Sequence, residues 1–125
     1  MAGLTLDAGA LIALDRNDRR VLLLLARTME EDAPVTVPAT ALTQAIRRPE
    51  RQARLARLLR QPTTTVVPLD RVEASLVGRL LATSATSDIT DAHVVICARR
   101  TGQVIVTTDP GDLRRLDPGA ELVEI

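Results

Sequence analysis

Hydrophobic residues fall into short continuous runs and into longer stretches where they recur every three or four positions. The short runs are bounded by glycine, proline or aspartate and predict strands, whereas the longer stretches predict amphipathic helices. The most uniformly apolar run, QVIVTTD at 103–109, indicates a strand buried on both faces. The predicted elements are strand 3–7, helices 8–14 and 17–32, strand 34–38, helices 39–48 and 50–60, strand 64–69, helices 70–84 and 87–102, strand 103–109, a helical turn at 111–116 and strand 120–125.

The predicted helices have recognisable ends. Asp70 and Asp88 stand where an N-cap is expected, Pro49 separates two helices, and Gly102 closes the helix before the most apolar strand. Strands that alternate with helices predict an α/β fold, a three-layer α/β/α sandwich with a mostly parallel central sheet. With 125 residues the chain suffices for one core, so we expect a single domain, 1–125.

Composition narrows the chemistry. The chain has no aromatic residue, so its core must be built from Leu, Val, Ile and Ala, and all of its basic residues are arginine, which excludes lysine-based catalysis. The formal net charge is zero, so any attraction to nucleic acid has to come from a local patch. A single cysteine excludes an internal disulfide, and the sequence has neither a leader nor a membrane span, so we expect a cytoplasmic protein.

Three aspartates stand where the predicted sheet would gather them. Asp7 ends the first strand, Asp109 ends the most apolar strand, and Asp91 lies in the first turn of the preceding helix. Sites in parallel sheets form at the carboxyl ends of the strands, so central first and fourth strands would bring these side chains together. Clustered carboxylates repel one another unless a cation is present, and hard oxygen ligands favour Mg²⁺ or Mn²⁺.

Each aspartate also has a purely structural interpretation. Asp7 can cap the helix that follows it, Asp88 and Asp91 can serve as a cap and a first-turn acid, and Asp109 opens the turn sequence DPGD. A plain α/β interaction protein with capping aspartates therefore remains an alternative. The joint placement at strand ends favours the metal site.

At this point the sequence resembles a known family. LTLDAGALIAL at 4–14, SDITDAHVVICARRTGQVIVTTDPGDL at 87–113 and the order of elements between them are similar to a PIN domain, most of all to the VapC-like toxin ribonucleases. The resemblance spans essentially the whole chain. It implies that Asp7, Asp91 and Asp109 bind Mg²⁺ or Mn²⁺ as the first, third and fourth acids of a site that hydrolyses RNA.

The same resemblance assigns supporting roles. Asp112 matches a further acid beyond the last one, and Thr107 or Thr108 matches a hydroxyl residue beside the metal. Of the two threonines, Thr108 is expected to support the metal site together with Asp112. The second acid, normally a glutamate, is replaced by Gln44 in VPATALTQAIRR. Glutamine keeps an acceptor oxygen but loses a negative charge, and Asp88 either compensates with a carboxylate or serves only as an N-cap.

A dense group of arginines suggests a contact with RNA. The spacing predicts an arginine stripe on a helical face, with Leu55, Leu58 and Leu59 turned inward. Arginine binds phosphate with two donors, so Arg47, Arg48 and Arg51 are the candidate RNA-binding residues, and a solvated helical face is the alternative. The group comprises Arg47, Arg48, Arg51, Arg54, Arg57 and Arg60.

The single histidine and the single cysteine of the chain are assigned no role in the metal site. His93 follows Asp91 by two positions, so on a helix it points elsewhere and we expect no metal role for it. Cys97 reads as a core residue.

The sequence therefore predicts a divalent-metal-dependent endoribonuclease, the toxin of a toxin–antitoxin pair. Its expected partners are RNA, a second copy of the chain as a homodimer, and a small antitoxin protein. The alternative is a PIN-like fold with weak or no nuclease activity that serves as an RNA- or protein-binding module.

Overall fold

The computed structural model describes residues 2–125. Its strands and helices alternate along the chain much as the hydrophobic pattern predicts. The strands are β1 (Leu4–Leu6), β2 (Val35–Pro38), β3 (Thr64–Val67), β4 (Val104–Thr107) and β5 (Leu122–Glu124). The helices are α1 (Ala8–Asp15), α2 (Arg19–Glu30), α3 (Ala39–Ala45), the 3₁₀ helix η1 (Pro49–Arg51), α4 (Ala53–Leu59), α5 (Arg71–Ser84), α6 (Ile89–Thr101) and α7 (Pro110–Leu116).

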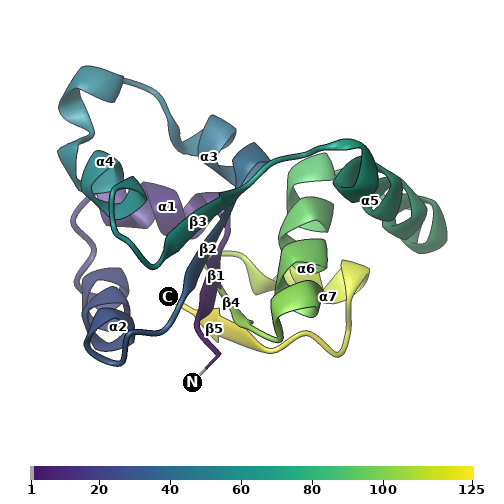
Figure 1. The fold of residues 1–125 in the computed structure, drawn as a ribbon. Coiled ribbons are helices and arrows are strands. Elements are labelled where there is room, and N and C mark those ends of the chain that lie inside the picture. Colours follow the sequence, from purple (N-terminus) through teal and green to yellow (C-terminus); the bar gives the residue numbers. More distant parts are fainter. Residues whose placement is uncertain (1) are drawn as a thin grey trace.

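The five strands form one sheet in the order β3-β2-β1-β4-β5, and every neighbouring pair is parallel. β1 lies beside β4, with Leu6 opposite Val106, as expected for central first and fourth strands. Helices cover both faces: α1, α2 and α4 lie on one side, and α5, α6 and α7 on the other (Figure 1). The predicted three-layer α/β/α sandwich is thus confirmed.

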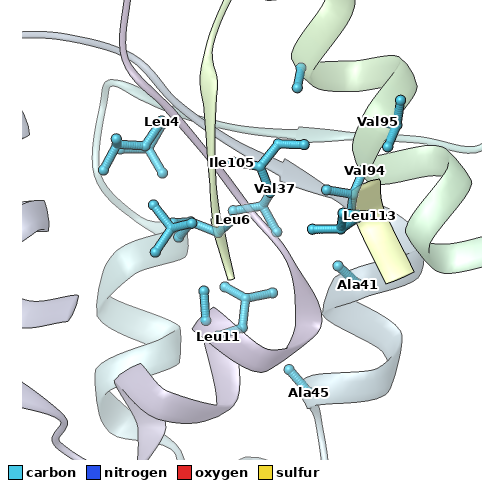
Figure 2. Packing of buried hydrophobic residues seen from close by; sticks show 14 of the residues in the cluster. Leu4, Leu6, Leu11, Val37, Ala41, Ala45, Val94, Val95, Ile105 and Leu113 are labelled. Atoms are coloured by element: carbon cyan, nitrogen blue, oxygen red, sulfur yellow. The ribbon is translucent and has the colours of Figure 1, made fainter. Parts of the chain in front are cut away.

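The core consists of aliphatic side chains, as the absence of aromatic residues requires. Leu4, Leu6, Val37 and Ile105 project from the sheet and are almost fully buried (Figure 2). They pack against apolar residues of the flanking helices, among them Leu11 of α1. This core fixes the central strands, and with them the position of the strand ends.

Most element boundaries differ by a few residues from those that the sequence predicts, and two of these differences bear on the candidate site. The helix predicted at 39–48 ends at Ala45, because Ile46 is extended and Gln52 accepts hydrogen bonds from the backbone N–H groups of Arg47 (3.0 Å) and Arg48 (3.2 Å). The prediction of an arginine stripe that continues along this helix is therefore wrong. Leu55 and Leu58 do face inward, as expected, from the shorter helix α4.

The strand predicted at 103–109 ends two residues early, at Thr107. The hydroxyl of Thr107 accepts a hydrogen bond from the backbone N–H of Asp109 (2.9 Å), which turns the chain, and Pro110 then starts α7. Asp109 consequently lies just beyond the strand and at the start of a helix.

Among residues 2–125, no helix combines the length and the hydrophobicity that a membrane span requires.

Candidate metal centre

The carboxyl edge of the sheet is where four helices begin. α1 follows β1, α3 follows β2 and α7 follows β4, while α6 runs back to the start of β4 and so begins at the same edge. α3 contacts both α1 and α6 there. Helix N-termini and strand ends thus converge on one edge, which is where parallel α/β folds place their sites.

Asp7 lies at the end of β1 and is 6% exposed. Its backbone N–H donates to Val106 of β4, and its carboxylate accepts a hydrogen bond from the N–H of Ala10 (2.8 Å). Burial raises the pKa of Asp7, and the charge of Asp109 raises it further, whereas hydrogen bonds from Thr107 and from the Ala10 N–H lower it. Asp7 therefore is both the cap of α1 and an electrostatic neighbour of Asp109.

Asp91 lies in the first turn of α6 and is partly buried. Its pKa is raised from 3.8 to about 7, first by burial and then by the charges of four carboxylates. The starts of three helices, α1, α6 and α7, thus bring five aspartates into one electrostatic cluster. The four carboxylates that raise the pKa of Asp91 are, in order of effect, Asp88, Asp112, Asp7 and Asp109.

Asp109 and the two threonines before it complete the inner part of the cluster. Thr107 is fully buried. Its hydroxyl forms a hydrogen bond with the carboxylate of Asp7 and accepts another from the N–H of Asp109. Thr108 is exposed and lies against Gly9, where an added Cβ would come within 2.1 Å of its hydroxyl oxygen. Thr107 thus contacts Asp7, and the Thr108 hydroxyl lies near the same carboxylate across Gly9, so both hydroxyl residues stay candidates.

Asp88 and Asp112 lie at the rim. Asp88 caps α6 by accepting a hydrogen bond from the N–H of Asp91 (2.9 Å), and Asp112 lies in the first turn of α7. Both line a cavity of about 250 Å³ together with Asp91 and Arg115. The N-cap role of Asp88 is therefore real, and its carboxylate still faces the same space as Asp91.

Helix capping accounts for only part of the cluster. Asp7 and Asp88 each cap a helix, but Asp109 makes no side-chain capping bond although it stands at the N-cap of α7. The carboxyl of Asp91 is influenced by burial and by like charges, with no hydrogen bond among the causes of its raised pKa. Asp91 thus bears an electrostatic cost that no hydrogen bond offsets, and the carboxylate of Asp109 is not used as a cap, which together are typical of a binding site.

Gln44 reaches the cluster from α3. Its amide Nε2 donates a hydrogen bond to the hydroxyl of Thr90 (2.9 Å), the residue next to Asp91. Gln44 and Thr90 also line an open hollow of about 510 Å³ that includes Asp88. Thr90 is a contact that the sequence did not indicate, because threonine inside a helix carries no motif signal.

The three candidate RNA-binding arginines are exposed but do not share one helix. Arg47 and Arg48 lie in the segment between α3 and η1, and Arg51 ends η1. The segment is held by Gln52, which is 5% exposed and donates through Nε2 to the carbonyl of Ala45 (2.9 Å). Gln52 was not identified from the sequence, since its hydrogen bonds depend on how the loop closes.

The chemistry of the candidate donors is that preferred by a hard divalent cation. These donors are the carboxylate oxygens of Asp7, Asp91 and Asp109, with the Gln44 amide at the side, and none of them is a sulfur or an imidazole nitrogen. Mg²⁺ and Mn²⁺ prefer such ligands, and their charge would offset the repulsion that raises the pKa of Asp91. The residues would therefore hold Mg²⁺ or Mn²⁺, and their assignment as ligands stays a prediction.

Neither a protein-family model nor a curated protein matches the sequence. Solved structures do match the fold. A chain of VapBC2 from Rickettsia felis, bound to a DNA fragment from its promoter, aligns with a TM-score of 0.68 and 12% identity over 98% of each chain. FitAcB from Neisseria gonorrhoeae aligns with a TM-score of 0.64 and 17% identity over 97% of this chain and 96% of the other. FitAB bound to the IR36 DNA fragment aligns with a TM-score of 0.65 and 14% identity over 97% of this chain and 94% of the other. This likeness establishes a shared fold across nearly the full length.

Proposed function

We propose that this protein is a divalent-metal-dependent endoribonuclease, the toxin of a toxin–antitoxin pair, which binds Mg²⁺ or Mn²⁺ through Asp7, Asp91 and Asp109. The observation that carries the proposal is that carboxylates from the ends of β1 and β4 and from the start of α6 meet at one edge. The fold supports it, since VapBC2 bears the name of the toxin family that the motifs resemble.

Each acid has a distinct task. The bound cation would polarise a phosphodiester oxygen and activate water. Asp7 offers a carboxylate whose position is fixed by Ala10 and Thr107, and Asp91 offers one from the first turn of α6. Asp109 lies after the turn made by Thr107, and its carboxylate is not used as a cap.

RNA would approach along the exposed side of this edge. Arg47, Arg48 and Arg51 lie in the segment that follows α3, the helix that carries Gln44. Because the chain has no aromatic residue to stack on bases, contacts with RNA would rest on phosphate and shape. A second copy of the chain and a small antitoxin protein are the protein partners of this proposal.

The test is RNA cleavage with Mn²⁺ in parallel with Mn²⁺ calorimetry. We expect the wild type to bind Mn²⁺ and cut RNA. Asp7→Asn should lose more activity than the roughly 10- to 100-fold that is typical when a residue supporting a metal ligand is changed. Gln61→Glu, an acid added away from the site, is the control and should behave as wild type. If Asp7→Asn leaves a robust activity unchanged, the assignment of the site is wrong.

One observation favours a second candidate, a PIN-like binding module with little or no nuclease activity. Gln44 replaces the expected acid, and its amide is already bound to Thr90. The variant Gln44→Glu distinguishes the nuclease from the binding module. If the wild type neither binds Mn²⁺ nor cuts RNA and Gln44→Glu restores both, the chain is a binding module and the nuclease proposal fails for it.

A further inference from the structure

A second group of metal-ligating side chains lies inside the molecule, between α5 and α6. Glu73 comes from the first turn of α5, and His93 and Cys97 come from α6, one helical turn apart and therefore on one face. All three are almost fully buried, at 2%, 0% and 2% exposure. Their ligand atoms lie within 4.8 Å of one another.

The imidazole of His93 is oriented by one hydrogen bond and unsatisfied at its other nitrogen. Nδ1 pairs with the hydroxyl of Thr40 (2.8 Å), whereas Nε2 is buried and has no hydrogen-bond partner within residues 2–125. The nearest acceptor is Oε1 of Glu73 at 3.6 Å, beyond hydrogen-bonding distance. When Nδ1–H donates to Thr40, the lone pair of Nε2 faces Glu73 and Cys97. An outer hydrogen bond of this kind fixes the tautomer of metal-binding histidines.

Glu73 presents its two oxygens to different partners. Oε2 pairs with the guanidinium of Arg100, and Oε1 faces His93 and the sulfur of Cys97, which lies 3.9 Å away. An ion pair with Arg100 explains why the carboxylate can be buried. It does not explain why a second carboxylate oxygen, an imidazole nitrogen and a thiol are gathered when the thiol donates only a long hydrogen bond (3.9 Å) to the carboxylate and the imidazole nitrogen has no hydrogen-bond partner among the described residues.

The spacing suits a tetrahedral ion. With the bond lengths of a zinc site, ligand atoms lie about 3.4 Å apart for a nitrogen–oxygen pair and about 3.6 Å apart for a sulfur–oxygen pair. The observed separations of 3.6 Å and 3.9 Å exceed these by only a few tenths of an ångström. Small side-chain rotations would therefore close the site.

We propose that Glu73, His93 and Cys97 form a second metal site, which takes Zn²⁺ or a similar borderline transition-metal ion. One nitrogen, one sulfur and one oxygen donor are a zinc-type set, unlike the all-oxygen donors of the aspartate cluster. Glu73 and Cys97 also line a cavity of about 400 Å³, from which water fills the fourth position. This site is independent of the proposed ribonuclease activity.

Charges and protons can be accounted for. The Cys97 thiol releases its proton to solvent when its sulfur binds the ion. Thiolate and carboxylate then face two positive charges on the ion and one on Arg100, so one positive charge remains, at the solvent-exposed guanidinium. Arg100, whose side chain is 55% exposed, keeps its pairing with Oε2 of Glu73. The ion would link the first turn of α5 to the middle of α6, the helix whose start carries Asp88 and Asp91.

Co²⁺ is the direct probe, because a thiolate bound to Co²⁺ gives a ligand-to-metal charge-transfer absorption in the near ultraviolet. Cys97 is the single cysteine of the chain, so this band reports on it alone. We expect metal-free full-length protein to develop the band to saturation at one equivalent of Co²⁺, and Zn²⁺ to abolish it by displacement. A wild type without the band, or a band that excess Zn²⁺ leaves intact, overturns the proposal.

Variants assign the other ligands. Asp7→Asn, which alters the aspartate cluster, should keep the band at full strength. Cys97→Ser should lose it, and His93→Asn should weaken Co²⁺ binding at least about tenfold, the lower end of the effect of an altered metal environment. Thermal unfolding provides the second readout: Zn²⁺ should raise the Tm of wild type and of Asp7→Asn, and should raise that of Cys97→Ser less. Loss of the band in Asp7→Asn, or an equal rise of Tm in Cys97→Ser, contradicts the assignment.

Discussion

At Asp91, burial and four neighbouring carboxylates all act against ionisation. With a pKa of about 7 in the folded protein and 3.8 as the ordinary value, the folded state holds this proton more tightly than the unfolded state does. The carboxyl contributes stability that is fully present below pH 3.8 and is lost as the pH rises through 7. The metal-free protein should therefore become less stable across this range.

The variant Asp91→Asn tests whether ionisation of Asp91 causes this loss of stability at higher pH. An amide keeps the shape of the side chain and cannot ionise, so we expect it to raise the free energy of unfolding by about 1–2 kcal/mol at pH 8 and to change it little at pH 4. This is less than the full linkage value because Asp91 is only partly buried and water screens its neighbours. Urea unfolding with EDTA at both pH values measures the effect. Glu30→Gln, an exposed carboxylate on α2, is the control. An equal effect of Asp91→Asn at the two pH values would show that its charge is not the cause.

Gly9 and Gly78 form a matched pair of helical glycines. A Cβ at Gly78 meets nothing within 4 Å, so Gly78→Ala should stabilise the protein by about 0.5–1 kcal/mol through helix propensity alone. A Cβ at Gly9 would lie 2.1 Å from the Thr108 hydroxyl and 3.4 Å from Oδ1 of Asp7, so Gly9→Ala has to displace Thr108 and should lose that gain. Differential scanning calorimetry compares the stabilities, and Mn²⁺ calorimetry should show weaker binding for Gly9→Ala only. Equal Tm gains in both variants would mean that Thr108 moves without cost.

At the scale of elements, the sequence predicts what is decided locally. Asp70, Asp88 and Gly102 cap their helices as expected, because these residues act on their own backbone neighbourhood. The convergence of Asp7 and Asp109 was also predictable, since parallel strands order their ends. The helix end at Ala45 was not, because Gln52 determines it from seven residues away. The Glu73, His93 and Cys97 group was not predictable either, since it depends on how α5 packs on α6.

The segment between α3 and α4 should depend on Gln52. Gln52→Glu keeps acceptors for the N–H groups of Arg47 and Arg48 but cannot donate to the carbonyl of Ala45, so we expect a loss of about 1–3 kcal/mol. Gln61→Glu, which changes only a long 3.4 Å hydrogen bond in an exposed position, should stay within about 0.5 kcal/mol of wild type. Urea unfolding measures both, and faster tryptic cleavage after Arg47 and Arg51 would place the change in the loop. Equal losses in the two variants would rule out this role for Gln52.

At the scale of the whole molecule, a chain of zero net charge separates its charges in space. Five aspartates meet at the carboxyl edge of the sheet, whereas exposed arginines follow α3. An electrically neutral protein of this kind lacks long-range attraction for RNA, so binding has to rely on the local arginines and on the cation that would screen the aspartates. RNA affinity should accordingly depend on both salt and metal.

The salt dependence of RNA binding therefore reports how many phosphates the protein contacts. In an Asp7→Asn background, which is expected not to cut, the double variant Arg48→Ala/Arg51→Ala should bind single-stranded RNA more weakly. It should also reduce the slope of log K against log salt by about 1.4, because each contact with a single strand contributes roughly 0.7. Arg27→Ala, an exposed arginine on α2, should leave the slope unchanged. Fluorescence anisotropy across a series of salt concentrations provides the slopes. If the double variant keeps the slope of its parent while Arg27→Ala lowers it, RNA lies on the α2 side of the molecule, and the segment after α3 is only a solvated surface.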